Sequence, residues 1–114
     1  MMMMIMMLMI MMMMLLIDTK ADMWSIGVIM YTLLGGYLPF HIEEDEDGDE
    51  LLRQRIKRGL FCFHEEYWRG ISREAIDLIK KLLAVNPWIR LTASEALMHP
   101  WFTEDEDLHG YMGR

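Results

Sequence analysis

The sequence predicts an all-α protein organised around one apolar helix. Residues 21–34 are almost entirely apolar, and they lie between Thr19, a residue that often begins helices, and a Gly35-Gly36 pair that often ends them. Segment 75–83 repeats apolar residues every three or four positions, which is the spacing of one helix face. No run of alternating apolar and polar residues is convincing enough to predict a strand. A chain of 114 residues is one domain at most.

The first 17 residues are a low-complexity apolar segment of eleven Met and six Ile or Leu. As a helix this segment would be about 26 Å long, slightly short of the roughly 30 Å hydrocarbon core of a bilayer. No basic region precedes it and no small-residue cleavage site follows it. Asp18 and Lys20 cancel, so no membrane orientation can be predicted. Three interpretations stay open: a membrane anchor, a buried or disordered apolar tail, and a low-complexity artefact of gene prediction.

The central helix is expected over residues 21–34. Thr19 with Asp22 three residues later forms a carboxylate variant of the capping box. Gly35-Gly36 can supply the left-handed residue that ends the helix. Because apolar side chains nearly encircle this helix, we expect it to be buried on all sides.

The next segment is acidic and is expected to be a solvated loop. Positions 43–50 hold seven carboxylates. Asp49 is a candidate cap for a short helix over 50–58, and Gly59 would end that helix. The aromatic-rich segment 60–68 has no clean periodicity and is predicted to be an ordered, packed loop.

Two further helices are predicted in the last third of the chain. Ser72 is a candidate N-cap for a helix that Pro87 would stop. Residues 92–95 form a full capping box for a short helix that runs to about Met98 and that Pro100 would end. The prediction is therefore a central helix with three shorter ones. The whole chain is expected to divide into three segments: a Met-rich segment 1–17, a folded part 18–102 and an acidic, loose tail 103–114.

Charge and cysteine content narrow the possible functions. The net charge is −7, and an acidic chain without a basic face repels phosphate backbones, so a nucleic-acid partner is not expected. Cys62 is the only cysteine, so no internal disulfide can form. This fits a reducing compartment and predicts a cytoplasmic chain, or a membrane-anchored one if residues 1–17 are genuine and inserted.

Four motifs occur in order along residues 19–102. They are Asp-x-Trp-Ser-x-Gly-Val at 22–28, Pro-Phe at 39–40, Asn-Pro at 86–87 followed by Arg90, and His-Pro-Trp-Phe at 99–102. Together they resemble the C-terminal lobe of eukaryotic serine/threonine protein kinases. The spacing from Trp68 through Ile71 to Ser72, and the last of the four motifs, are most similar to the calcium/calmodulin-dependent kinase group.

The resemblance implies structural roles for four residues. Asp22 would hydrogen-bond the backbone of the catalytic loop, and Arg90 would pair with the glutamate that closes the activation segment. Both of those partners are absent from this sequence. Trp24 and Gly27 would be packing positions, a large apolar side chain and a place where another element comes close.

The residues that perform phosphoryl transfer in that family are missing from these 114 residues. The family uses ATP and magnesium, held by a Gly-x-Gly-x-x-Gly loop, a His-Arg-Asp loop and an Asp-Phe-Gly segment. None of these occurs here, nor does Ala-Pro-Glu. We therefore assign no catalytic, cofactor-binding or metal-binding residue, and expect the chain by itself to be inactive.

Other candidate sites are weaker. Positions 43–48 resemble the opening of a calcium loop, but the first ligand is Glu and the twelfth position is Gln54. The four histidines have no metal-ligand spacing with Cys62 or with each other, and His99 is expected to be a structural helix-end residue. Neither Ser25 nor Cys62 has a base nearby in sequence.

Two hypotheses for function remain. The first is a truncated kinase C-lobe whose partners are the missing kinase segments, or the substrates or regulators of the parent enzyme. Such a chain should expose an apolar patch and be poorly soluble alone. The alternative is a non-catalytic protein-binding module that docks partners through residues 50–68 and is tethered to a membrane by residues 1–17.

Overall fold

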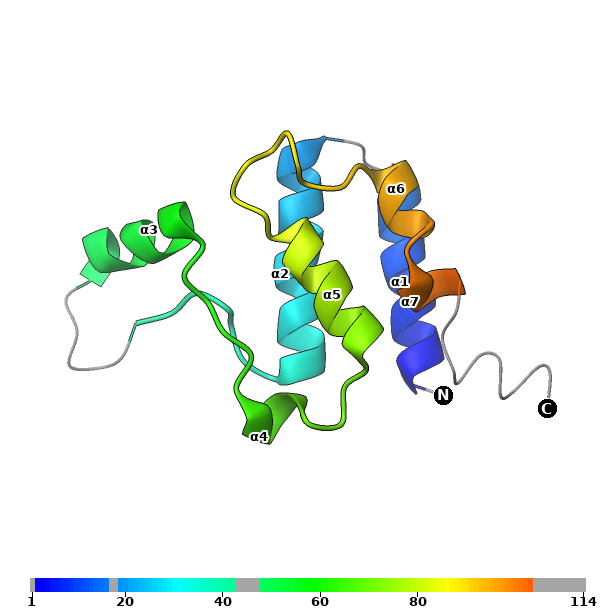
Figure 1. Cartoon of the computed structure of the whole chain (residues 1–114), viewed down its shortest axis with the longest axis horizontal. Coiled ribbons are helices and arrows are strands. Elements are labelled where there is room, and N and C mark those ends of the chain that lie inside the picture. Colours follow the sequence, from blue (N-terminus) through cyan, green and yellow to red (C-terminus); the bar gives the residue numbers. More distant parts are fainter. Residues whose placement is uncertain (1, 17–18, 43–47, 104–114) are drawn as a thin grey trace.

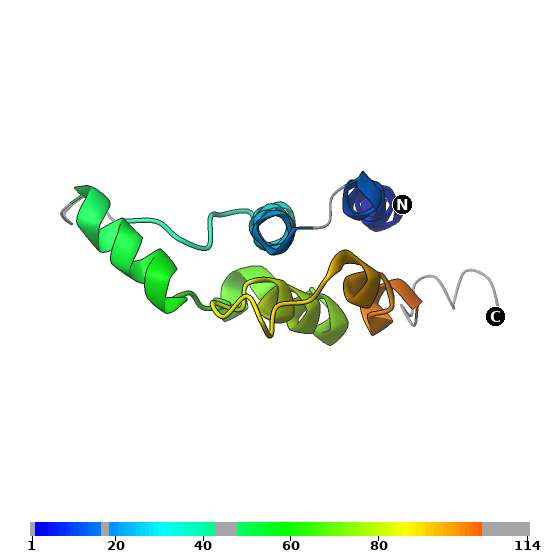
Figure 2. The same cartoon turned by 90° about the horizontal axis from the view of Figure 1, so that it is seen from above.

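The computed structural model describes residues 2–16, 19–42 and 48–103, and these form two layers of helices (Figures 1 and 2). Helices α1 and α2 lie side by side in one layer, and α5, α6 and α7 form the other; α3 lies at the far end of the molecule. The described part of the chain contains no strand, which confirms the all-α class. The helices are α1 (Met2–Leu16), α2 (Lys20–Gly35), α3 (Gly48–Arg58), α4 (Glu65–Trp68), α5 (Arg73–Leu82), α6 (Ala93–Leu97) and α7 (Pro100–Thr103).

Helix α2 begins and ends at the predicted signals. The Thr19 hydroxyl accepts a hydrogen bond from the backbone N–H of Asp22 (3.1 Å). Gly36 has a φ of 84°, the left-handed conformation that glycine adopts without strain, and its N–H donates to the carbonyl of Thr32 (2.9 Å).

Burial of α2 is less complete than its all-round apolar pattern predicts. One face is buried, with Met23, Ile26 and Met30 among its residues. On the opposite face Ile29 and Leu33 are exposed, because only one layer of helices packs against α2. The same face carries two small exposed residues, Ala21 and Ser25, at four-residue spacing.

The methionine-rich segment forms a regular helix that packs against α2 and α6. Met7, Ile10 and Met14 recur on one face of α1 and are buried in the common core, which agrees with the interpretation of a buried apolar segment for that face. Among the described residues, no helix combines the length and the apolar character that crossing a bilayer requires.

Helix α5 supplies the other half of the core. The Ser72 hydroxyl accepts the N–H of Ala75 (3.2 Å), as the sequence predicts. Helices α2 and α5 form the most extensive helix pair among the described residues. The α5 residues buried there are Ala75, Leu78, Ile79 and Leu82.

The prediction that Pro87 stops α5 is wrong, since the helix ends five residues earlier at Leu82. The backbone carbonyls of Ala84 and Val85 accept hydrogen bonds from the Arg90 guanidinium. The Arg90 side chain therefore supplies these carbonyls with the hydrogen bonds that backbone N–H groups would supply in a longer helix. The helix can then end before the proline.

Pro100 was predicted only to end the helix before it, but it also begins a further helix. It is the first residue of α7, a position where its fixed φ is favourable and its missing N–H costs nothing. The capping box before α6 is confirmed: the Thr92 hydroxyl accepts the Glu95 N–H (3.1 Å), and the Glu95 carboxylate accepts the Thr92 N–H (2.8 Å).

Two short helices differ from the prediction. Helix α3 begins at Gly48 rather than at residue 50, with Asp49 and Glu50 in its first turn, where carboxylates favour a helix N-terminus. Gly59, with a φ of 64°, ends it as expected. Helix α4 lies inside the segment predicted to be a loop, because four residues are too few to show a period. The calcium-loop resemblance and the acidic tail fall on residues 43–47 and 104–114, which lie outside the described residues.

Candidate functional site

Arg90 fastens the α5–α6 connection to the start of α2. Its guanidinium donates from Nε to the carbonyl of Ala84 (2.8 Å), and from Nη2 to that of Val85 (3.2 Å). Nη1 donates to the carbonyl of Lys20 (2.7 Å), 70 residues away in sequence. Partial burial lowers the pKa of Arg90, which still remains protonated because guanidinium is so strong a base.

Lys20, in the first turn of α2, makes the reciprocal contact. Its ammonium group donates to the carbonyl of Pro87 (2.8 Å) and to the carbonyl of Arg90. The two side chains therefore each bind the backbone of the other segment, and together they join residues 84–90 to the first turn of α2. Sequence reasoning missed Lys20, because nothing near it in the chain indicates a partner so far away.

Asp22 lies in the first turn of α2, where a carboxylate is favoured by the helix dipole. Within the described part of the chain, no hydrogen bond or ion pair involves its carboxylate; its backbone N–H is the group that bonds Thr19. Its side chain is half-buried. A carboxylate in this position can accept hydrogen bonds from another segment.

Trp24 and Gly27 lie at packing contacts of α2. The Trp24 ring is half-buried and stacks on the Phe40 ring, with centroids 5.8 Å apart and planes 14° apart. Gly27 is buried where α5 comes close: a Cβ at this position would lie 2.9 Å from Cβ of Leu82 and 3.0 Å from Cδ2 of Leu83. Only a residue without a side chain fits there without displacing α5.

A cavity of about 420 Å³ opens beside these residues. Trp24, Ile56 and Val85 give it apolar walls, and Lys57 and Arg90 bring two positive charges to it. The Arg90 guanidinium has five N–H donors and uses three of them on carbonyls. This arrangement can bind a carboxylate that lies next to apolar side chains.

An aromatic cluster packs at the C-terminal end of α2. It consists of Tyr31, Tyr37, Phe61, Phe63 and Trp68. The Trp68 indole N–H donates to the Tyr37 hydroxyl (3.0 Å), and the Trp68 ring lies directly over Gly35. The Tyr31 hydroxyl donates to the carbonyl of Cys62 (2.5 Å), and burial raises the pKa of Tyr31. The cluster orders the segment that sequence periodicity left undefined.

Beside the aromatic cluster is a second cavity of about 300 Å³ that includes Cys62 and His64. The Cys62 sulfur lies 3.4 Å from Nε2 of His64, which is only two residues along the chain, so the prediction that Cys62 has no base nearby in sequence is wrong. Among the described residues, no group of three or more His, Cys, Asp or Glu side chains lies close enough together to hold a metal ion.

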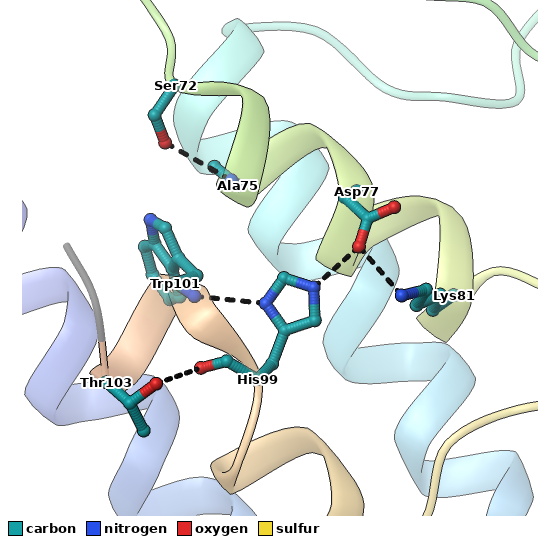
Figure 3. A network of polar contacts seen from close by, with 7 residues as sticks. All are labelled: Ser72, Ala75, Asp77, Lys81, His99, Trp101 and Thr103. Atoms are coloured by element: carbon teal, nitrogen blue, oxygen red, sulfur yellow. Dashed lines mark hydrogen bonds and ion pairs between the residues drawn. The ribbon is translucent and has the colours of Figure 1, made fainter.

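His99 is a buried connector between α7 and α5 (Figure 3). The backbone N–H of Trp101 donates to its Nδ1 (3.0 Å), so Nδ1 carries no hydrogen in this arrangement. Nε2 therefore carries the hydrogen and donates to the Asp77 carboxylate (2.7 Å), which also receives the Lys81 ammonium (2.9 Å). The i,i+4 spacing could have revealed the Asp77–Lys81 pair, but the 22 residues between Asp77 and His99 carry no such signal.

Replacing Asp77 with Asn should lower stability in a pH-dependent way. The hydrogen bond from His99, with help from Lys81 and against desolvation, lowers the pKa of Asp77 below its usual 3.8. A carboxyl with a lowered pKa in the folded state stabilises it above the unfolded-state pKa, and this is lost as the pH falls through the folded-state pKa. The loss at pH 7 should be about 1 kcal/mol or less, because Asp77 is half exposed.

Urea unfolding at several pH values measures this difference. The native and Asp77→Asn chains should differ at pH 7 and converge as the pH falls well below 3.8. Asp49→Asn makes the same change at an exposed first-turn position of α3, where the carboxylate interacts, within ranges 2–16, 19–42 and 48–103, only with the helix N-terminus, and so controls for the contacts of Asp77 with His99 and Lys81. A difference between native and Asp77→Asn that is the same at every pH would show that the charge of Asp77 contributes nothing.

Comparison with known proteins decides the family. The sequence model of the protein kinase domain matches residues 13–102, which is most of the chain. The chain belongs to the protein kinase family. Its match to the C-terminal lobe of serine/threonine kinases includes Trp24, Gly27 and Arg90.

The chain is similar in sequence to several curated serine/threonine kinases. It is 45% identical over 89 residues to a calcium and calcium/calmodulin-dependent serine/threonine-protein kinase of Oryza sativa subsp. japonica, an alignment that covers 78% of this chain and 16% of the relative. It is 43% identical over 94 residues to ribosomal protein S6 kinase alpha-3 of Homo sapiens (82% and 13%). Identity to calcium-dependent protein kinase 3 of Plasmodium berghei is 45% over 85 residues (75% and 15%). The chain thus spans about a sixth or less of the length of these relatives.

Proposed function

We propose that this polypeptide is a non-catalytic segment of a serine/threonine kinase C-lobe, which by itself neither holds ATP with magnesium nor transfers phosphate. One observation carries the proposal: the chain keeps the packing residues of the lobe and has none of the motifs that bind nucleotide, metal or the attacking hydroxyl. The parent activity would be ATP-dependent protein phosphorylation. A single cysteine supports the cytoplasm as its location, which fractionation of cells expressing a tagged chain would test.

The proposed partner is a protein segment that places a carboxylate in the cavity at Arg90. Lys57 and Arg90 supply positive charge there, and Trp24 supplies an apolar wall. In the kinase family the corresponding arginine pairs with the glutamate that closes the activation segment. The two unused N–H groups of Arg90 can donate to such a carboxylate, and the Asp22 carboxylate can separately accept hydrogen bonds from N–H groups of the missing part of the domain.

A transfer assay and a calorimetric titration test the two halves of this proposal. Purified chain with labelled ATP, magnesium and a mixture of serine- and threonine-containing peptides should incorporate no phosphate above the background without protein, and titration with Mg–ATP should give no binding heat. A peptide that carries Ala-Pro-Glu should bind, and its Ala-Pro-Gln version should bind about tenfold more weakly or not at all.

An active serine/threonine kinase run in parallel is the control for the assay. Phosphate incorporation that follows the chain through a second purification step would contradict the inactive state. Equal binding of the Glu and Gln peptides would contradict the carboxylate-binding cavity while leaving the first half of the proposal intact.

A further inference from the structure

Methionine dominates helix α1. Ten of its fifteen residues are methionine, and none is charged. Within the described ranges of the chain, His, Cys, Asp and Glu side chains form no group that could hold a metal ion, but the methionine thioether is a metal ligand of another class. It is a neutral, soft sulfur donor that suits copper(I), whereas magnesium, calcium and manganese prefer oxygen ligands.

Three of these methionines occupy neighbouring positions on the surface of α1. Met12 and Met13 follow Met9 by three and four residues, and helix residues at both spacings are neighbours whose Cβ atoms lie about 5–6 Å apart. Since Met12 and Met13 are also adjacent in sequence, the three positions form a triangle, which we call the methionine triangle. A methionine side chain has three rotatable bonds, so its sulfur can turn toward a point shared with the other two.

The side chains of the methionine triangle are accessible. Met9 and Met12 are 55% and 63% exposed, and Met13 is half-buried. Met7 and Met14, by contrast, are buried in the core. Among the methionines whose side chains the structure describes, no other three have this i, i+3, i+4 spacing. Spacing and exposure together therefore select these three residues.

Packing does not require sulfur at the methionine triangle. Exposed side chains bury little area, and leucine has a similar volume and a similar helix propensity. The match to the protein kinase domain begins at residue 13, so Met9 and Met12 lie outside it. The property that the three residues share, and that leucine lacks, is the thioether.

The surroundings of the methionine triangle favour a soft, singly charged cation. Its neighbours along the same face are Ile5, four residues before Met9, and Leu16, four residues after Met12, and neither adds a ligand. Three neutral sulfurs leave the charge of a divalent ion uncancelled, and a hard cation would lack the oxygen ligands that it prefers. The net charge of −7 attracts any cation without selecting one. Copper(I) fits these conditions.

We propose that Met9, Met12 and Met13 bind one copper(I) ion through their sulfur atoms. The ion would join two successive turns of α1 on its exposed side, and Met7 and Met14 would stay in the core. This goes beyond the proposed lack of catalysis and does not depend on it.

Calorimetric titration of the full chain with copper(I), held in solution by acetonitrile under nitrogen, tests the proposal. One ion should bind per chain, with a Kd of about 1 µM or lower. All samples carry Cys62→Ser, because the thiolate of Cys62 is also a soft ligand. Met9→Leu, Met12→Leu and Met13→Leu together should weaken binding about tenfold or more.

The matched control removes the same number of thioethers elsewhere in α1. Met4→Leu, Met7→Leu and Met11→Leu together leave the methionine triangle intact and should keep its stoichiometry and affinity. Circular dichroism checks that both triple variants keep the native helix content. Met12→Leu alone changes one exposed side chain, and it should also weaken binding without disturbing the fold.

Methyl NMR with silver(I), a diamagnetic ion of the same charge, locates the ion independently. The methyl signals of Met9, Met12 and Met13 should shift, and those of the buried Met7 and Met14 should not. Equal weakening by the two triple variants would overturn the proposal. So would several ions bound with similar affinity, or no binding at ion concentrations up to about 100 µM.

Discussion

Replacing Trp101 with alanine is expected to lower the free energy of unfolding by about 4 kcal/mol. The side chain is 1% exposed, and its ring packs edge-on against Phe102 with centroids 4.9 Å apart. Its backbone N–H is also the group that fixes His99 (Figure 3). Truncation would leave a cavity in the core where α7 packs against α5. Thermal unfolding at one fixed chain concentration should show a fall in Tm of more than about 15 °C.

Trp88→Ala is the matched control for this prediction. Trp88 is 90% exposed, so the same truncation removes almost no buried area and should change stability by no more than about 0.5 kcal/mol. Equal losses for the two variants would mean that Trp101 is not a core residue, and that the packing of α7 against α5 contributes little.

The local signals in the sequence predicted the helices well. Thr19, Ser72 and Thr92 are caps whose bonds reach only three residues along the chain, so their meaning does not depend on the rest of the fold. Glycines at the ends of α2 and α3 are equally local, since a positive φ is a property of the residue itself.

Contacts between distant segments were not predictable in the same way. Lys20 and Arg90 bind each other's backbone across 70 residues, and no pattern in either segment specifies the other. The wrong end assigned to α5 has the same origin, because the guanidinium that satisfies the Ala84 carbonyl belongs to the later loop. The site positions Asp22, Trp24, Gly27 and Arg90 came from the family resemblance and not from periodicity, and their family roles stay predictions.

The α2 pattern illustrates a different limit. A helix with apolar residues on every side predicts complete burial only if something covers every side. In this chain one face of α2 packs on α5 and the opposite face carries Ile29 and Leu33 in the open. The apolar pattern of α2 alone therefore could not show which of its faces the rest of this chain leaves exposed.

The close contact of α2 and α5 at Gly27 makes this glycine the most sensitive position of the helix pair. A glycine in a helix interior normally costs about 1 kcal/mol relative to alanine. Here the cost is offset, because the absence of a side chain lets Leu82 and Leu83 approach the α2 backbone directly. The nearest of these atoms is the Cβ of Leu82, which cannot rotate away, so any added side chain must push the helices apart.

Gly27→Val is therefore expected to lower the free energy of unfolding by about 3 kcal/mol, despite the better helix propensity of valine. Gly70→Val is the matched control, since a Cβ at Gly70 meets nothing within 4 Å and the change should be close to neutral. Urea unfolding of both variants at one chain concentration measures the difference. Gly27→Ala should fall between the native chain and Gly27→Val, because the single methyl group gains helix propensity but still meets Leu82. If Gly27→Val were as stable as the native chain, α5 could not lie against α2 at this distance, and the two-layer core would be arranged differently.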